Sequence, residues 1–183
     1  VIVGEYCTRN AMLPFEVDTT TIEQGFAVLL DREFNIWYTG TPDVGKVVMR
    51  GSGSVYTVDT KSTGSYLTAE YKRGYRTASQ VTGYLWGLRE VTGLPYVGAF
   101  INAINIKKIP DSNRRCSDHG VQYSECGLMH AEMELFPVTR TPQQIEAWRV
   151  NAIALARRYR ARLERVRTAA DLPMVPMEGQ FAQ

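Results

Sequence analysis

The feature that most restricts how this chain can fold is a turn of four small residues, Gly51-Ser52-Gly53-Ser54. Glycine and serine in succession are typical of a reversal of chain direction. The stretch that follows, Val55 to Lys61, is rich in β-branched residues, which favour strands. The sequence therefore predicts a β-hairpin centred near Ser52, whose two strands face each other residue by residue.

Two more strands are expected before this turn. Phe26 to Leu30 is a short apolar run, and Asp31-Arg32-Glu33 would form the turn after it. Ile36 to Val44 is typical of a second strand. Together with Val55 to Lys61, these segments are expected to form an antiparallel meander.

The middle of the chain shows a helical pattern followed by a buried strand. A helix is predicted from about Arg76 to Val91, and Gly93 with Pro95 should end it. Tyr96 to Ile106 is a long, mostly apolar segment that suits the interior of a sheet. The polar residues 107–127 are expected to form an exposed loop.

The last two elements have clear sequence signals. Met129 to Val138 is expected to be an edge strand. The helix after it should begin with Thr141 as its N-cap, Pro142 in its first position and Gln144 completing a capping box. Its buried stripe is predicted to contain Ile145, Trp148, Ala152, Leu155, Tyr159, Leu163 and Val166.

This order of segments predicts an α/β fold with a central mixed sheet flanked by helices. A chain of 183 residues that is 44% hydrophobic suits one compact domain over residues 1–183. Because the chain begins with Val1 rather than Met, we expect it to be trimmed at one or both termini. No apolar run approaches the ~20 residues needed to span a bilayer, so no membrane partner is expected.

Three charged residues converge across the predicted hairpin. A centre near Ser52 places Asp43 opposite Lys61, and a slip of two residues places it opposite Asp59 instead. Asp59 and Lys61 share one face because side chains alternate along a strand, and opposite partners share a face as well. The three side chains therefore meet in either register.

This arrangement suits hydrolysis of a phosphodiester. Two adjacent carboxylates, Asp43 and Asp59, repel each other and favour a cation between them. Mg²⁺ prefers one or two carboxylates together with waters and phosphate oxygens, and a bound metal activates water for attack on phosphorus. Lys61 could orient that water or stabilise the charge that develops. The alternative is a solvated salt-bridge network on an open sheet face.

The motifs Thr39-Gly40-Thr41-Pro42-Asp43 and Val58-Asp59-Thr60-Lys61 resemble the PD-(D/E)XK nuclease superfamily, over roughly residues 23–150. Gln80-Val81-Thr82-Gly83-Tyr84 resembles the Q-x-x-x-Y element of its RecB-like branch, which includes Cas4-like and phage-type exonucleases. The resemblance implies a restriction-endonuclease-like core and Mg²⁺- or Mn²⁺-dependent cleavage of DNA that leaves 5′-phosphate ends. It also implies catalytic roles for Asp43, Asp59 and Lys61.

The resemblance extends to metal and DNA contacts. It implies that Asp43 and Asp59 bind the metal and that Gln80 and Tyr84 position the DNA strand. Many members carry a further acidic residue upstream, for which Glu23 is the best candidate. Members of this branch also have a histidine on an upstream helix, and neither His119 nor His130 occupies that position. The late cysteines that hold an iron–sulfur cluster in some members are absent from this sequence.

Two basic segments are candidates for DNA contact. Before the central helix, three tyrosines alternate with basic residues, as base stacking and phosphate contacts would require; the alternative is a loop that packs on the sheet edge. Arginines are also frequent in the last helix, where they either bind phosphate or form a solvated face. The residues of the first segment are Tyr66, Lys72, Arg73, Tyr71, Tyr75 and Arg76.

The cysteines and histidines suggest a second site. Cys116, His119, Cys126 and His130 fall within a short span and could hold a structural zinc ion, or they could belong to a loop with free thiols. With Cys7 the chain has three cysteines, an odd and low number that favours a reducing compartment, here the cytoplasm of a bacterial or phage-infected cell.

Three functions are consistent with these patterns. The first is a metal-dependent DNA exonuclease of recombination, repair or phage DNA processing, with a helicase or recombination partner. The second is a non-catalytic nucleic-acid-binding module that keeps the nuclease fold. The third is a structural protein with an unrelated α/β fold, which would hold Asp43 and Asp59 far apart.

Overall fold

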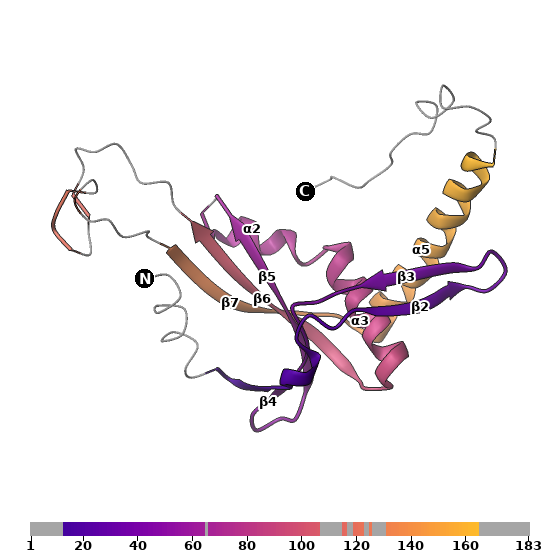
Figure 1. The fold of residues 1–183 in the computed structure, drawn as a ribbon, viewed down its shortest axis with the longest axis horizontal. Coiled ribbons are helices and arrows are strands. Elements are labelled where there is room, and N and C mark those ends of the chain that lie inside the picture. The colour runs from indigo at the N-terminus through magenta and orange to yellow at the C-terminus, as the bar shows by residue number, and fades with distance from the viewer. Residues whose placement is uncertain are drawn as a thin grey trace.

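The centre of the protein is a five-stranded mixed sheet, shown in Figure 1. The computed structural model describes residues 13–64, 66–106, 115–116, 119–122, 125 and 131–164. The strands β5 and β6 run parallel, and the other neighbours in the sheet are antiparallel. In spatial order the strands are β1 (Phe15–Val17), β4 (Val44–Met49), β5 (Val55–Thr63), β6 (Tyr96–Ile106) and β7 (Ala131–Thr139).

The crossover between β5 and β6 contains two helices, α2 (Ala69–Gly74) and α3 (Ser79–Thr92), and a third, α5 (Pro142–Leu163), follows β7. A parallel pair requires such a connection because a short turn cannot join the end of one strand to the start of the next. The predicted α/β class with a mixed sheet flanked by helices is confirmed.

Two hydrophobic clusters lie on the two faces of the sheet. The larger one packs α3 and α5 on β6, with Leu85, Ile101 and Ala103 fully buried. The smaller one lies on the other face and includes Val58 and Phe100. Because side chains alternate along a strand, Asp59, which follows Val58, points towards the helices. The helix-bearing face is therefore the face of the candidate site.

The predicted three-stranded meander is wrong. β2 (Phe26–Asp31) and β3 (Ile36–Gly40) form a separate two-stranded sheet, which Figure 1 shows alongside α5. The predicted strand from Ile36 to Val44 breaks after Gly40 and resumes as β4. Two local features explain the break: Pro42 has no N–H for a ladder, and a side chain at Gly40 would collide with the rings of Phe26 and Tyr84.

The predicted hairpin at Gly51 and Gly53 is confirmed, and both glycines have positive φ angles, of 84° and 68°. Its ladder pairs Val48 with Val55 near the turn, and Val44 with Val58 beyond an irregularity in β4. This irregularity shifts the register by one residue. A shift of one residue turns side chains to the opposite face of a sheet. The irregularity therefore determines on which face the side chains before Val44 lie.

The helices differ from expectation at their ends. α3 begins at Ser79 rather than near Arg76, and part of the tyrosine-rich segment before it forms α2, for which no helix was predicted. Gly93 ends α3 with φ of 68°, as predicted. The capping box of Thr141 and Gln144 on α5 is confirmed.

The buried stripe of α5 is shorter than predicted. Ile145 is buried, but Leu163 is 53% exposed, and Val166 lies outside the described residues. Figure 1 shows that the C-terminal half of α5 extends beyond the five-stranded sheet and lies beside the β2–β3 hairpin instead. The predicted central position of Tyr96–Ile106 and the edge position of the following strand are confirmed. Most of the predicted loop at 107–127 lies outside the described residues.

Candidate active site

Asp59 and Lys61 lie two residues apart on β5 and form an ion pair. Asp59 is 3% exposed, whereas the side chain of Lys61 is 30% exposed. Oδ2 of Asp59 lies 2.8 Å from Nζ of Lys61. That contact lacks the angles of a hydrogen bond, and Oδ2 accepts none from the described residues. The site thus contains a buried carboxylate oxygen that is ion-paired with Lys61 but accepts no hydrogen bond from the described residues.

Asp43 reaches the same place from the loop before β4. Its Oδ2 accepts a hydrogen bond of 2.5 Å from the backbone N–H of Thr60, the residue between Asp59 and Lys61. The ladder pairs Val44 with Val58, which places Asp43 beside Asp59 rather than opposite Lys61. Of the two predicted registers, the structure therefore has the one shifted by two residues at this end of the hairpin.

The electrostatics of the site are dominated by the burial of Asp59. Burial raises the pKa of this carboxyl above its ordinary value because it removes water from the ionised form. The close contact and positive charge of Lys61 lower this pKa, and the negative charge of Asp43 raises it. The nearby lysine therefore compensates only part of the cost of ionising Asp59.

Two tyrosines lie near the buried carboxylate, Tyr71 in α2 and Tyr75 at its C-cap. The hydroxyls of Tyr71 and Tyr75 are 3.0 Å apart, and the ring of Tyr75 contacts Phe136 with centroids 5.7 Å apart. Burial raises the pKa of Tyr75, and the charge of Asp59 contributes to this rise. Both tyrosines therefore pack on the sheet, as one of the two sequence-based alternatives required, whereas Tyr66 is 70% exposed.

The Q-x-x-x-Y element of α3 contacts the loop that carries Asp43. Nε2 of Gln80 donates a hydrogen bond of 2.9 Å to the hydroxyl of Tyr84. That hydroxyl donates one of 3.2 Å to the backbone carbonyl of Thr41. Tyr84 is buried and Gln80 is exposed. The pair therefore connects the solvent-facing start of α3 to the backbone two residues before Asp43.

Glu23 lies next to Asp43 through its backbone. Its N–H donates a hydrogen bond of 2.9 Å to the carbonyl of Asp43, and its φ of 51° is unusual for a residue other than glycine. Its side chain is exposed. Within the described ranges, no three or more side chains of His, Cys, Asp or Glu are grouped so that they could hold a metal ion.

Some of the basic residues predicted to contact DNA form ion pairs within the protein. Lys72 pairs with Glu134 at 2.6 Å, and Arg73 pairs with the exposed Glu70 at 3.0 Å. Arg76 is exposed. Exposed ion pairs of this kind contribute little to stability, so Lys72 and Arg73 can exchange a carboxylate for a phosphate at small cost.

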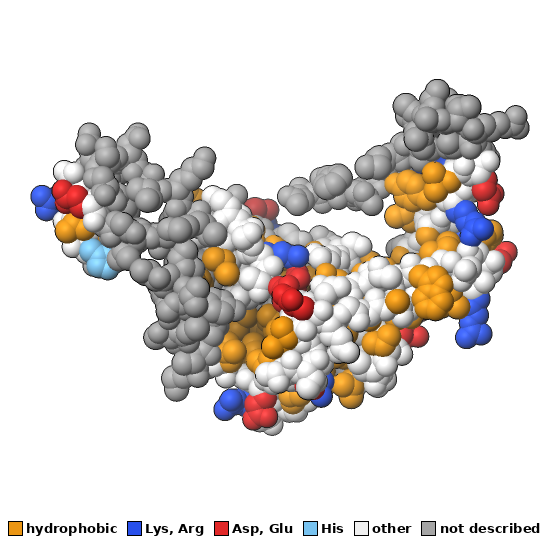
Figure 2. All heavy atoms as spheres, viewed as in Figure 1, with side chains coloured by type: hydrophobic (Ala, Val, Ile, Leu, Met, Phe, Trp, Pro, Cys, Tyr) orange, Lys and Arg blue, Asp and Glu red, His pale blue; other side chains and the backbone are white. Residues whose placement is uncertain are grey.

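The arginines of α5 were expected either to bind phosphate or to form a solvated helix face, but Arg157 does neither. Arg157 pairs with the buried Asp31 and with Glu33, and its guanidinium lies 5.0 Å from the ring centroid of Phe34. These contacts fasten the β2–β3 hairpin to α5. In Figure 2, charged and hydrophobic side chains alternate over this arm of the molecule. The sequence gives no sign of these pairs because the partners are over a hundred residues apart.

A buried arginine that the sequence did not single out lies behind α2. Arg140 is 8% exposed and donates hydrogen bonds to the carbonyl of Tyr75 at 2.9 Å and to Oγ1 of Thr82 at 2.8 Å. Burial lowers its pKa. Arg140 therefore joins the end of α2 to the start of α3, and so fixes Tyr75 relative to the site.

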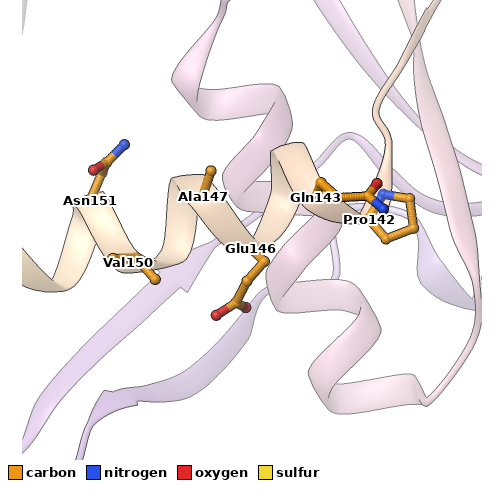
Figure 3. A pocket seen from close by; sticks show the side chains of 6 residues that line it. All are labelled: Pro142, Gln143, Glu146, Ala147, Val150 and Asn151. Carbon is orange, nitrogen blue, oxygen red and sulfur yellow. The ribbon is translucent and has the colours of Figure 1, made fainter.

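The surface depression in Figure 3 is formed entirely by α5 and is separate from these residues. Its only ionisable side chain is Glu146, which is paired with Arg149. It is open and shallow, so it offers no set of groups for chemistry. The residues that line it are Pro142, Gln143, Glu146, Ala147, Val150 and Asn151.

A scan of protein-family models finds none that matches this chain, and a search of curated proteins finds no match either. Among the described helices, none combines the length and apolar composition that crossing a bilayer requires.

Proposed function

We propose that this protein is a metal-dependent nuclease that hydrolyses phosphodiester bonds of DNA, with Asp43, Asp59 and Lys61 at its active centre. The observation that supports this most is the buried Asp59 carboxylate, whose pKa is raised and whose Oδ2 accepts no hydrogen bond from the described residues. A purely structural ion pair gains nothing from a second carboxylate, Asp43, at the same place.

The residues fit a divalent cation. Oδ2 of Asp59 has unused bonding capacity, and Asp43 supplies a second oxygen donor from the neighbouring loop. Hard oxygen ligands of this type, few in number, suit Mg²⁺ or Mn²⁺, which also take water and phosphate oxygens. When bound, such an ion activates water and neutralises charge on the phosphate. Glu23 is a further candidate ligand in this proposal.

The protein's own groups would supply position and charge. Lys61 is ion-paired on one side and exposed to solvent on the other, so its ammonium can hold an attacking water or a phosphate oxygen. Gln80 is exposed above the Thr41 carbonyl and can contact a DNA strand. Three basic residues lie in α2 or shortly after it and can bind phosphates further along the DNA strand: Lys72, Arg73 and Arg76.

We further propose that the substrate is DNA with a free end, so that the protein is an exonuclease of recombination, repair or phage DNA processing. Such a nuclease would act in the cytoplasm of a bacterial or phage-infected cell, with a helicase or recombination partner. This finer assignment rests on the resemblance of Gln80 and Tyr84 to the Q-x-x-x-Y element. The alternative, a binding module without catalysis, is an outcome of the test below.

The first test is cleavage of end-labelled linear DNA and closed circular DNA with Mg²⁺ or Mn²⁺. Wild type should degrade linear DNA only when metal is present, and Lys61→Ala should abolish this. Lys46→Ala is the matched control: Lys46 is similarly exposed, at 32%, and pairs with Asp18 instead of Asp59. It should cleave as wild type does.

Other outcomes would change the assignment. Nicking of closed circles would indicate an endonuclease. Binding of DNA without cleavage in either metal would favour the non-catalytic module. Equal loss of activity in Lys46→Ala and Lys61→Ala would remove the support for Lys61 as part of the active centre.

A further inference from the structure

The four side chains predicted to hold a zinc ion are described only in part. Sγ of Cys116 and Nδ1 of His119 are 3.4 Å apart, whereas Cys126 and His130 lie outside the described residues. The zinc site therefore stays a prediction of the sequence.

The burial of Asp59 limits access to its carboxylate. The residue is 3% exposed, and its Oδ2 atom is buried. Mg²⁺ keeps several waters when it binds a protein and also contacts phosphate oxygens, so it needs open space beside its ligands. In the proposed nuclease, on which this inference rests, Asp59 binds the metal. Part of the protein must therefore move before metal and DNA can reach this carboxylate.

The register of the sheet shows which side chains of β7 lie beyond the candidate site. Asp59 and Phe136 are paired with the same residue of β6, and so are Lys61 and Glu134. Paired residues share a face of the sheet, and neighbouring strands lie ~4.8 Å apart. The two residues of β7 therefore lie on the helix-bearing face, about 10 Å from the candidate site across β6.

α2 contacts both of these residues of β7. The ring of Tyr75, the C-cap of α2, packs on Phe136 with centroids 5.7 Å apart. Nζ of Lys72 lies 2.6 Å from Oε1 of Glu134. Burial raises the pKa of Tyr75, and the charge of Asp59 adds to this rise, so these two side chains are close. α2 therefore borders the candidate site on the side of β7.

α2 is fastened to the sheet more weakly than the chain on either side of it. None of the six residues of α2, all within the described part of the chain, is buried. The side chains of Lys72 and Glu134 are 35% and 37% exposed, and an exposed ion pair adds little stability. By contrast, the chain is anchored before the helix by the buried Leu67, and after it by a hydrogen bond from Arg140 to the carbonyl of Tyr75. α2 can therefore tilt away from β7 without unfolding its neighbours.

We propose that the Lys72–Glu134 ion pair is a latch, which holds α2 on β7 until DNA binds. A phosphate of the DNA strand competes with the carboxylate of Glu134 for the ammonium of Lys72, because both anions form charge-assisted hydrogen bonds with it. When the phosphate takes Lys72, α2 tilts away from β7 and the space beside Asp59 opens to metal and water. Glu134 is thus a positioning residue, which acts through Lys72 and restricts metal binding to protein that carries DNA.

Removal of either partner of the latch should open α2. Hydroxyl-radical footprinting of the metal-free full chain measures this, because α2 shields Phe136, which is 9% exposed. Glu134→Gln and Lys72→Gln should each raise the labelling of Phe136 about two- to fivefold, the factor that corresponds to an exposed ion pair. Glu70→Gln is the matched control: Glu70 pairs with Arg73 inside α2, at 3.0 Å, and its loss should leave this labelling unchanged.

The two variants should differ in their affinity for DNA but not in their affinity for metal. Glu134→Gln releases Lys72 and should tighten binding of a labelled DNA oligonucleotide in EDTA about two- to fivefold, whereas Lys72→Gln removes a phosphate contact and should weaken it. Without DNA, Mn²⁺ should bind both variants about two- to fivefold more tightly than wild type, because more of the protein is open. Fluorescence polarisation measures the DNA affinity, and electron paramagnetic resonance measures the Mn²⁺ affinity.

Unchanged labelling of Phe136 in both latch variants, or an equal increase in Glu70→Gln, would overturn the latch. Mn²⁺ affinities equal to that of wild type would overturn its control of the metal site. The labelling is measured without metal or cleavage, so it separates the latch from the proposed function. Cleavage by wild type with unchanged labelling would remove the latch alone, and increased labelling without any cleavage would remove the nuclease alone.

Discussion

At the scale of single residues, Asp59 combines a cost in stability with a proposed role in catalysis. Its folded-state pKa is raised, so the folded chain holds this proton more tightly than the unfolded chain does. The free energy of unfolding should therefore fall as the pH rises from the ordinary value of 3.8 through the raised pKa. A metal bound to the ionised form would reverse this cost.

Asp59→Asn is expected to raise the free energy of unfolding at neutral pH without metal, by about 0.5–2 kcal/mol, while it abolishes cleavage. This increase in the free energy of unfolding should become smaller at pH values below those at which carboxyls ordinarily titrate, because Asp59 of the wild type is then protonated in both the folded and the unfolded chain. Thermal melting in EDTA measures the effect. The control is Asp18→Asn: the pKa of Asp18 is lowered, chiefly by hydrogen bonds from Thr20 and Lys46, so this variant should not be stabilised. A less stable Asp59→Asn would contradict the prediction.

The pKa of Asp59 itself should respond to its two charged neighbours in opposite directions. Asp43→Asn removes a negative charge and should lower this pKa, whereas Lys61→Ala removes the ion-paired ammonium and should raise it. Carbon-13 NMR titration of the aspartate carboxyls without metal measures both shifts. If neither variant moved the pKa, the three side chains would not form one electrostatic unit.

The convergence of these three residues could be predicted from the sequence because it depends on local rules. Alternation along a strand puts Asp59 and Lys61 on one face, and the glycine turn limits the registers open to Asp43. The roles of Tyr75 and Arg140 could not be predicted. Each depends on where helices far along the chain come to rest, and nothing in the neighbouring sequence specifies it.

At the scale of elements, α3 is packed so closely that glycine is needed inside it. A Cβ on Gly87 would overlap the ring of Phe26 in β2, and one on Gly83 would overlap Tyr38 and Trp148. In an exposed helix interior, alanine would be favoured over glycine by roughly 0.5–1 kcal/mol. Here the absence of a side chain allows the β2–β3 hairpin and α5 to contact α3.

Gly87→Ala is therefore expected to reduce stability, by about 1–3 kcal/mol, because buried rings must move to admit the methyl group. Gly74→Ala, at the end of α2, is the matched control, since nothing lies within 4 Å of the position of its Cβ. It should be neutral or mildly stabilising. Chemical denaturation measures both, and an equal effect of the two substitutions would argue against the close approach at α3.

Tyr84→Phe tests whether α3 positions the loop before Asp43. Loss of the hydroxyl removes the bonds to Gln80 and to the Thr41 carbonyl, at a cost of about 1 kcal/mol in stability. A small displacement of Asp43 should lower kcat about ten- to hundredfold. Tyr56→Phe serves as control, because Tyr56 packs its ring on Phe100 in the other cluster. Full activity of Tyr84→Phe would assign Tyr84 to packing alone.

Elements with strong terminal signals were predicted well, and those without them were not. Thr141 and Gln144 fixed the start of α5, and Gly93 fixed the end of α3. The separation of β3 from β4 was missed because Gly40 and Pro42 interrupt a segment that is otherwise strand-like. α2 was not predicted although Tyr71 and Tyr75 have the i, i+4 spacing of a helix, because six residues are too few for a clear pattern; packing of its C-cap Tyr75 on Phe136 helps to stabilise it.

At the scale of the whole molecule, the arm formed by α5 and the β2–β3 hairpin is held by charge as well as by packing. Arg157→Gln should increase hydrogen exchange in β2 and β3 at neutral pH. A hydrogen bond from Arg157 lowers the pKa of Asp31. The stabilisation that this pair gives the folded state is therefore present above the ordinary carboxyl pKa, and it is lost as the pH falls through the lowered pKa of folded Asp31. Exchange in wild type and variant should therefore converge in strong acid. Arg149→Gln is the comparison, because Arg149 pairs with Glu146 inside α5 and not with the hairpin.

The parallel pairing of β5 with β6 also has a consequence for how the chain folds. Their contacts join residues far apart in sequence, across the crossover that contains α2 and α3, so we expect them to form late in folding. By contrast, the antiparallel partner of β5 is β4, which is close to it in sequence. Asp59 and Lys61 both lie on β5. The ladder beside Asp43 can thus close early, but the helices that bury Asp59 dock later. During refolding, helical circular dichroism should return before cleavage activity does, and newly made chains should stay inactive until β6 is in place.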